Sequence, residues 1–391
     1  MGEPSGQQDA RGVIVIAAGG TGGHMFPAEA LASELGRRGW RIALVTDARG
    51  ERYAAQFPCD HKYMVDAATF SGRGLAGKVG AAFAIAGGVF RSVGLLRRLK
   101  PAAVIGFGGY PSLPAMAAAT ILRLPRAIHE QNAILGRVNR AFASHVTRIA
   151  GGFPGMGRLP TGGRDKLQFI GNPVRDAVRA RAGAPYEAPN ADGPVRVLIF
   201  GGSQGARILS EAAPKAFADL PPPARARLRL VQQCREEDLE SVRSIYEAAG
   251  IEAELAPFFR DLADRLAAAH LVVSRAGASS VTELAVIGRP SVLVPFAAAM
   301  DDHQTANAAA LANAGACAVI AEQDFTPARL RAELTKLLSD DDGLQRMAEA
   351  ARGVGRADSA ERLADLVEDL AGGERAVATS ARASHKEGAQ A

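Results

Sequence analysis

One glycine-rich pattern occurs twice in this chain, each time directly after a short apolar run. VIVIAAGGTGGH covers residues 13–24, and RVLIFGGSQGAR covers residues 196–207. The two stretches align with Gly19 on Gly201 and Thr21 on Ser203, an offset of 182 residues. A buried strand that breaks into glycines and then opens a helix is the repeating unit of Rossmann-like folds. Two copies therefore predict two similar domains of this kind.

Short apolar runs rich in β-branched residues alternate with longer helical patterns along the chain. Continuous apolar strands separated by helices are typical of a parallel sheet covered on both faces. We therefore predict an α/β fold with two doubly wound domains. The runs are VIVIA (13–17), RIALVT (41–46), AAVIGF (102–107), VRVLIF (195–200), LRLVQQ (228–233), HLVVS (270–274) and SVLVPF (291–296).

The length of 391 residues suits two domains of about 150 to 200 residues each. We place the first over 12–174 and the second over 175–356. The amphipathic stretch 357–371 is expected to form a helix that packs back on the first domain. The ends, 1–11 and 372–391, are expected to be disordered tails.

Several features favour a cytoplasmic protein. The three cysteines form no CxxC pair, which argues against a zinc site and suits a reducing compartment. The polar beginning MGEPSGQQDAR is unlike a signal peptide. Residues 102–122 are uncharged, but GFGGYPSLP interrupts them, so we expect a strand, a loop and a helix there instead of a membrane span.

The charge is divided unevenly along the chain. Residues 1–174 hold 21 Lys and Arg against 10 Asp and Glu, or +11, and the remainder holds 25 against 31, or −6. Such a basic half attracts polyanions. Because the signatures of nucleic-acid binding are absent, we expect no nucleic-acid partner. The stretch 72–100 mixes apolar residues with six Lys and Arg and no acid, which is consistent either with a surface resting on an anionic membrane or with an ordinary helix that has a basic outer face.

Four glycine-rich loops follow predicted strands: GGTGGH (19–24), GFGGYPS (106–112), GGSQGA (201–206) and SRAGASS (274–280). Backbone N–H groups and helix starts at such loops bind anions. None of the four is a GxGxxG dinucleotide fingerprint or a P-loop, so hydride transfer and nucleotide hydrolysis lose support. Glu283, about one turn into the helix after the fourth loop, can accept hydrogen bonds from a ribose diol; alternatively it is a solvated helix residue.

The motifs GGTGGHMFPAEALASEL, GFGGYPSLPAMAAA, HEQNAILGRVNR, GNPVRDAV, VLIFGGSQGARILS and SRAGASSVTELAVIGRPSVLVPF occur in this order. From about Val13 to Leu370 the chain resembles the bacterial undecaprenyldiphospho-muramoylpentapeptide N-acetylglucosaminyltransferases. The resemblance implies a GT-B fold, two Rossmann-like domains facing across a cleft. It also implies transfer of N-acetylglucosamine from UDP-N-acetylglucosamine to lipid I with inversion, giving lipid II, without a cofactor and without a bound metal.

The resemblance further implies where the ligands bind. It assigns the donor site to Thr21, Gly22, Gly23, Asn132, Arg175, Ser203, Phe259, Gly277, Ala278, Ser279, Ser280, Val281, Thr282, Glu283 and Gln304. Gln304 is carried over from a family region that often holds two glutamines, and here His303 stands beside it. The acceptor site is expected at Gly108, Gly109, Tyr110 and Ser112.

The acceptor hydroxyl needs a base, and an imidazole with a pKa near neutrality suits that role. His24 is our candidate, with Glu130 as the alternative; Glu130 is otherwise a structural carboxylate that accepts nearby backbone N–H groups. We expect a peripheral protein on the cytoplasmic face of the inner membrane, with other cell-wall synthesis proteins as partners. The competing interpretations are another GT-B transferase with a lipid acceptor and a non-catalytic nucleotide-sugar-binding subunit.

Overall fold

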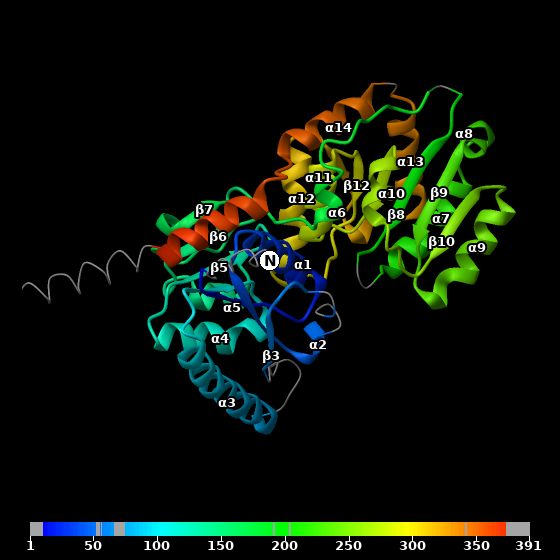
Figure 1. The fold of residues 1–391 in the computed structure, drawn as a ribbon. Helices are drawn as coiled ribbons and strands as arrows, with labels where there is room; N and C mark the ends of the chain where they lie inside the picture. Colours follow the sequence, from blue (N-terminus) through cyan, green and yellow to red (C-terminus); the bar gives the residue numbers. More distant parts are fainter. Residues whose placement is uncertain are drawn as a thin grey trace, which may run out of the picture. The chain divides into compact units, whose positions relative to one another are not determined.

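The computed structural model describes residues 11–51, 55, 57–65, 75–190, 192–202, 205–340 and 342–372. The chain divides into two compact units (Figure 1), unit 1 being Met1–Pro173 with Asp358–Ala391 and unit 2 being Val174–Ala357. The expected boundaries, after residues 174 and 356, lie within one residue of these. The two expected tails fall almost wholly outside the described residues.

Unit 1 is built on a parallel sheet of seven described strands in the order β3-β2-β1-β4-β5-β6-β7. Seen from β1, the chain first extends the sheet to one side and then crosses over to the other, as in doubly wound folds. The strands are β1 (Val13–Ala17), β2 (Arg41–Thr46), β3 (His61–Met64), β4 (Ala103–Gly106), β5 (Arg126–Glu130), β6 (Arg148–Gly151) and β7 (Leu167–Phe169).

Helices pack on both faces of this sheet, so that strands such as β1 are buried on both sides. One face packs against α1 and the helix over 359–372, and the other against α4, with α3 lying along α4 (Figure 1). The labelled helices of this unit are α1 (Gly22–Arg37), α2 (Ala48–Glu51), α3 (Leu75–Leu99), α4 (Gly109–Ile121), α5 (Arg137–Phe142) and the 3-10 turn η1 (Arg164–Lys166).

The helix over 359–372 returns to unit 1, although the whole of unit 2 precedes it in sequence. Leu363 and Val367 are fully buried in the core of unit 1. Arg38 of unit 1 donates to Glu368 over 2.8 Å, and the Trp40 indole N–H donates to the same carboxylate over 2.8 Å. Apolar packing and charge-assisted hydrogen bonds together hold this helix on the sheet.

Unit 2 repeats the plan with a parallel sheet of six described strands, in the order β10-β9-β8-β11-β12-β13. The strands are β8 (Val195–Phe200), β9 (Leu228–Gln233), β10 (Glu252–Ala256), β11 (Leu271–Ser274), β12 (Ser291–Leu293) and β13 (Cys317–Val319). Its helices and 3-10 turns are α6 (Asp176–Arg179), α7 (Arg207–Ala218), α8 (Pro222–Ala226), η2 (Glu236–Asp238), α9 (Leu239–Ala248), α10 (Leu262–Ala268), α11 (Ala278–Ile287), η3 (Met300–Asp302), α12 (His303–Asn313), η4 (Glu322–Asp324), α13 (Pro327–Leu338) and α14 (Gly343–Val354).

The strand order places the four glycine-rich loops. In unit 1 the crossover lies between β1 and β4, and in unit 2 it lies between β8 and β11. GGTGGH and GFGGYPS follow β1 and β4, and GGSQGA and SRAGASS follow β8 and β11. Each pair therefore stands at the topological switch point of its sheet, where doubly wound folds bind ligands.

The α/β fold with two doubly wound units is confirmed, and the strand, loop and helix expected over 102–122 are present as β4, its loop and α4. Among the described residues, no helix combines the length and the apolar character that crossing a bilayer requires. Cys234 is buried as a free thiol, and Cys59 and Cys317 are half-buried thiols.

Candidate functional site

The loop between β1 and α1 places His24 in the first turn of a helix. Gly20 has φ of +84°, a conformation that glycine adopts readily. Thr21 is the N-cap of α1, and its Oγ1 lies 3.1 Å from His24 Nδ1. A Cβ built on Gly109, at the start of α4, would lie 3.5 Å from His24 Cε1. The imidazole is therefore close to the second glycine loop of the same unit.

Asp47, directly after β2, accepts a hydrogen bond from the backbone of this loop. Its buried Oδ1 accepts the N–H of Gly20 over 3.1 Å and that of Gly50 over 2.9 Å, while Oδ2 accepts from Arg49 Nε over 2.9 Å. A Cβ on Gly19 would fall 2.8 Å from the same Oδ1. The close approach requires glycine there, and the carboxylate fixes the path of the loop.

The GFGGYPS loop opens α4 with two glycines of positive φ, Gly108 and Gly109. A Cβ on Gly108 would stand 3.0 Å from Asn139 Nδ2, so the backbone here lies close to Asn139 of α5. Ser112 is fully buried and donates its hydroxyl hydrogen to Gly109 O over 2.9 Å. Tyr110 is half-buried. The hydroxyl group of Ser112, one of the predicted acceptor-site residues, therefore points toward the first turn of its own helix.

Glu130, the last residue of β5, is 3% exposed. Its Oε1 accepts the N–H and the side-chain amide of Asn132, both over 3.1 Å, and its Oε2 accepts Gly136 N over 2.9 Å and Asn139 Nδ2 over 2.9 Å. Four hydrogen bonds engage both oxygens. This geometry favours the structural alternative for Glu130, in which the carboxylate orients Asn132.

His129 lies beside this carboxylate but has a different environment. It is fully buried, its Nε2–H donates to Gly171 O over 3.1 Å, and its Nδ1 accepts from Gln131 Nε2 over 3.1 Å. Burial lowers the pKa of His129 to about 4. A neutral imidazole with both nitrogens engaged connects the HEQN segment to the GNP segment and is a packing residue.

In unit 2 the loop after β8 carries Gly201, Gly202 and Gly205; Ser203, a predicted donor-site residue, lies outside the described residues. A Cβ on Gly201 would meet Ala206 N at 2.4 Å, so only glycine fits there. Gln233 at the end of β9 accepts Gly201 N–H over 3.2 Å. Its amide donates to Gly202 O and to Pro257 O, both over 3.1 Å.

Gln233 thereby connects the glycine loop to the loop that carries Phe259. The ring of Phe259 is buried, and the guanidinium of Arg265 lies 4.3 Å from its centroid. The family resemblance implies that this position contacts the uracil of the donor through its backbone atoms. Such a contact requires that the backbone of residues 257–259 is held in place. The hydrogen bond from Gln233 to Pro257 O holds one end of this segment.

The loop after β11 ends in Gly277, the N-cap of α11, with its first-turn N–H groups at the carboxyl edge of the sheet. Glu283 is buried one turn further on, and its Oε1 lies 3.8 Å from Arg175 Nη2. Burial raises the pKa of Glu283, which the nearby Arg175 partly offsets. The helix start can receive a diphosphate, and the carboxylate can accept hydroxyl hydrogens.

Gln304 and His303 begin α12. The Oε1 of Gln304 accepts Phe296 N–H over 2.9 Å, and His303 Nδ1–H donates to Met300 O over 2.7 Å. Asn307, fully buried on the same helix, donates to Ala276 O over 3.2 Å. The start of α12 is therefore attached both to the loop after β11 and to the loop after β12.

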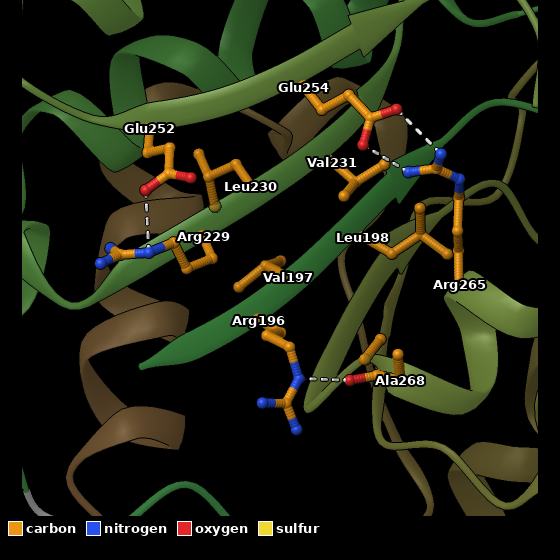
Figure 2. A pocket seen from close by; sticks show the side chains of 11 residues that line it. Arg196, Val197, Leu198, Arg229, Leu230, Val231, Glu252, Glu254, Arg265 and Ala268 are labelled. Atoms are coloured by element: carbon orange, nitrogen blue, oxygen red, sulfur yellow. Dashed lines mark hydrogen bonds and ion pairs between the residues drawn. The ribbon is translucent and has the colours of Figure 1, made fainter. Parts of the chain in front are cut away.

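A cavity of about 270 Å³ lies elsewhere on unit 2, on the outer face of β8, β9 and β10. Figure 2 shows its charged groups engaged with one another or with backbone: Arg229 with Glu252 over 2.9 Å, Arg265 with Glu254 over 2.7 Å, and Arg196 Nε with Ala268 O over 2.7 Å. Arg196, Arg229 and Glu252 stand at the first or second position of their strands. The cavity is thus near the amino ends of these strands, away from the glycine loops.

Residues that position the loops were missed by sequence reasoning. Asp47, Gln233 and Asn307 each carry a buried side chain whose hydrogen bonds reach a glycine loop or the backbone beside it. Asp47 and Gln233 share one signal, a polar residue at or just after the end of a parallel strand. The described residues contain no cluster of three His, Cys, Asp or Glu that could hold a metal ion.

Two domain families match the chain. The glycosyltransferase family 28 N-terminal domain matches residues 14–151, and the glycosyltransferase family 28 C-terminal domain matches residues 196–364. The chain is 50% identical over 360 residues to the UDP-N-acetylglucosamine–N-acetylmuramyl-(pentapeptide) pyrophosphoryl-undecaprenol N-acetylglucosamine transferase of Rhodopseudomonas palustris (strain BisA53), covering 92% of this chain and 96% of the relative. The transferase of the same name from Paramagnetospirillum magneticum (strain ATCC 700264 / AMB-1) is 49% identical, with the same two coverages.

Solved structures agree with this relationship. MurG of Acinetobacter baumannii superposes with a TM-score of 0.75 at 31% identity, over 92% of this chain and 99% of that one. A glycosyltransferase of kitacinnamycin has a TM-score of 0.65 at 19% identity, over 92% and 99%, which shows the shared fold alone. The chain belongs to glycosyltransferase family 28 and, within it, to the N-acetylmuramyl-(pentapeptide) pyrophosphoryl-undecaprenol N-acetylglucosamine transferases.

Proposed function

We propose that this chain transfers N-acetylglucosamine from UDP-N-acetylglucosamine to lipid I, the undecaprenyl-diphospho-muramoylpentapeptide, and so forms lipid II. The observation that carries the proposal is the 50% identity, over 92% of the chain, to a transferase named for this reaction. The four glycine loops at the two switch points supply the anion-binding geometry that the substrates need.

Unit 2 holds the donor in this account. The first-turn N–H groups of α11 bind the diphosphate, and its charge is stabilised further as UDP departs. The Glu283 carboxylate accepts hydrogen bonds from the ribose hydroxyls. Gln304 contacts the sugar, and the backbone near Phe259 contacts the uracil. Hydrogen bonds hold the Gln304 side chain and the backbone at Pro257 in place, which suits electrostatic preorganisation.

Unit 1 supplies the base. His24 Nδ1 lies 3.1 Å from Thr21 Oγ1, and if the nitrogen donates this bond, Nε2 is the atom that can accept the proton of the acceptor hydroxyl. The hydroxyl oxygen then forms its bond to the anomeric carbon while the bond to UDP breaks, with inversion. Glu130, whose oxygens already accept four hydrogen bonds, acts by orienting Asn132.

The lipid acceptor requires a membrane surface, and α3 offers one. Phe83 and Phe90, seven residues apart on this helix, are 75% and 81% exposed. Arg91, Arg97 and Arg98 are exposed on the same helix. Exposed aromatic rings beside several cations suit peripheral binding to the anionic cytoplasmic leaflet.

The test is acceptor-dependent release of UDP by the purified chain. With UDP-N-acetylglucosamine and a soluble lipid I analogue, we expect turnover that requires both compounds. Turnover with UDP-glucose or UDP-galactose instead would assign a different donor, and UDP-sugar binding without any turnover would leave a nucleotide-sugar-binding subunit.

A further inference from the structure

The loop after β12 is held by side chains from three separate parts of unit 2. Arg275, directly after β11, donates through Nη1 to Val294 O over 3.3 Å and to Pro295 O over 3.5 Å. Gln304 from α12 accepts Phe296 N–H over 2.9 Å, and Glu322 from η4 accepts the next N–H, that of Ala297, over 2.6 Å. Four successive backbone groups, at residues 294–297, are thereby fixed.

Glu322 and Arg275 form the central contact of this arrangement. The Arg275 guanidinium donates through Nη2 to Glu322 Oε1, while Glu322 Oε2 binds Ala297 N–H. The side chains of Arg275 and Glu322 are 10% and 20% exposed. Although burial raises the pKa of Glu322, the hydrogen bonds from Arg275 and Ala297 lower it below the ordinary value. The carboxylate is therefore a charged bridge between the two segments.

The loop that this bridge holds also binds the side-chain amide of Gln304. Because Oε1 of Gln304 is taken by Phe296 N–H, the Nε2 group is the end of the amide that remains for a ligand hydroxyl. Arg275, the second residue of the SRAGASS loop, points into the 294–297 segment and not toward α11. The loop of residues 294–297 thus connects Arg275, in the loop proposed to bind the diphosphate, to Gln304, which is proposed to contact the sugar.

We propose that Glu322 is a specificity-positioning residue, which holds residues 294–297 against Arg275 and thereby fixes the Gln304 amide that selects the donor sugar. Glu322 itself touches no substrate in this account. The inference rests on the proposed function, in which Gln304 contacts the hexose. The proposal predicts that one substitution at Glu322, which contacts neither the sugar nor the nucleotide, changes the preference among donor sugars and leaves the affinity for UDP nearly unchanged.

The experiment is calorimetric titration of the full chain with UDP, UDP-N-acetylglucosamine, UDP-N-acetylgalactosamine and UDP-glucose. In Glu322→Ala we expect affinity for UDP within about threefold of wild type, because the nucleotide contacts are elsewhere. The preference for UDP-N-acetylglucosamine over its galacto epimer should fall about tenfold or more. Glu322→Gln keeps one of the two hydrogen bonds and should lose less of the preference.

Glu252→Gln is the matched control, because Glu252 also pairs with an arginine of unit 2 but on the outer sheet face. It should leave all four affinities unchanged. An unchanged sugar preference in both Glu322 variants, or an equal loss of UDP and UDP-sugar binding, would overturn the inference. A wild-type chain that binds UDP but does not prefer UDP-N-acetylglucosamine would instead refute the donor assignment of the proposed function.

Discussion

His24 is the residue on which the chemistry of this account depends. Its side chain is positioned by Thr21 and lies beside Gly109, so the ring is close to both glycine-rich loops of unit 1. We expect His24→Ala to lower kcat by about 100-fold, the size expected for a lost general base, and to change UDP affinity by no more than several-fold. Steady-state kinetics with both substrates, together with UDP titration, measure the two effects.

His145→Ala is the control for this variant, because His145 is an exposed histidine of the same unit. It should retain wild-type kcat. A near-normal kcat in His24→Ala would assign proton removal to another group or to solvent.

Glu283 shows a conflict between binding and stability. Its folded-state pKa is raised, mainly by burial, so its favourable contribution to stability is complete below the unfolded pKa and is lost as pH rises through the folded pKa. At pH values above the folded-state pKa, the buried charge of Glu283 lowers the free energy of unfolding. We expect Glu283→Gln to have a higher free energy of unfolding than wild type at neutral pH, with the difference shrinking as pH falls toward 4.5. Denaturant unfolding at several pH values measures this difference.

The same substitution should weaken UDP binding about 10- to 100-fold, because a hydrogen bond to a charged group contributes about 1.5–3 kcal/mol. Glu349→Gln, on the exposed face of α14, should change neither quantity. If Glu283→Gln were less stable than wild type and bound UDP normally, Glu283 would be a structural partner of Arg175 and not a ribose ligand.

At the scale of elements, the first glycine loop depends on a carboxylate from the neighbouring strand end. Asp47→Ala would leave the N–H groups of Gly20 and Gly50 without their acceptor. Each unsatisfied buried N–H group lowers the free energy of unfolding by about 1–3 kcal/mol. We expect kcat to fall 10- to 100-fold while UDP affinity stays within about threefold. Turnover assays and UDP titration of the purified variant measure these changes.

Asp47→Asn is the matched variant, since Oδ1 alone accepts both N–H groups and the amide keeps that oxygen. It should stay within about threefold of wild type in kcat. Equal losses in the two variants would point to the charge of Asp47, and not to its support of the loop.

Helix α3 carries the proposed membrane surface. Phe83→Ser with Phe90→Ser should reduce binding to anionic vesicles at least tenfold, because burying a Phe side chain contributes about 1.5–3 kcal/mol. Neutralising Arg97 and Arg98 should weaken binding further and reduce its dependence on salt. Vesicle sedimentation at two salt concentrations measures both effects.

Phe258→Ser is the control, because Phe258 is 61% exposed but belongs to unit 2. It should bind vesicles as wild type does. Wild-type binding by the Phe83 and Phe90 variant would leave α3 as an ordinary basic helix packed on α4.

The sequence predicted the strands that read as continuous apolar runs, and missed those that do not. All seven predicted runs contain strands of the structure. The predicted runs did not include the edge strands β3 (HKYM) and β10 (EAELA), which have exposed positions, or β5 (RAIHE), in which polar residues interrupt the apolar run. They also did not include the short strands β6, β7 and β13. Such strands lack the apolar continuity that burial on both faces produces.

At the scale of the whole molecule, much of the site followed from topology. The sequence predicted four glycine-rich loops after strands of two doubly wound sheets, and the structure places these loops, after β1, β4, β8 and β11, at the switch points. The positioning residues could not be found in the same way. Glu322 lies 47 residues after Arg275, and only the packing of β13 beside β12 brings η4 to the 294–297 loop.

The net charge is unevenly divided between the two units: the basic residues 1–173 form most of unit 1, whereas the net-acidic remainder contributes residues 174–357 to unit 2 and 358–391 to unit 1. The account requires one enzyme in which unit 1 supplies the base and the lipid acceptor surface and unit 2 supplies the activated sugar. Neither a binding protein nor a hydrolase would join the sugar to the acceptor.

The most direct measurement is the identity of the product. The full chain is incubated with UDP-N-acetylglucosamine and a lipid I analogue, and the lipid product is analysed by mass spectrometry and by proton NMR of its new anomeric centre. The account predicts one added N-acetylhexosamine in β linkage, with UDP released in equal amount, and a strongly reduced yield with His24→Ala. An α-linked product, free N-acetylglucosamine, or no product from the wild-type chain would contradict it.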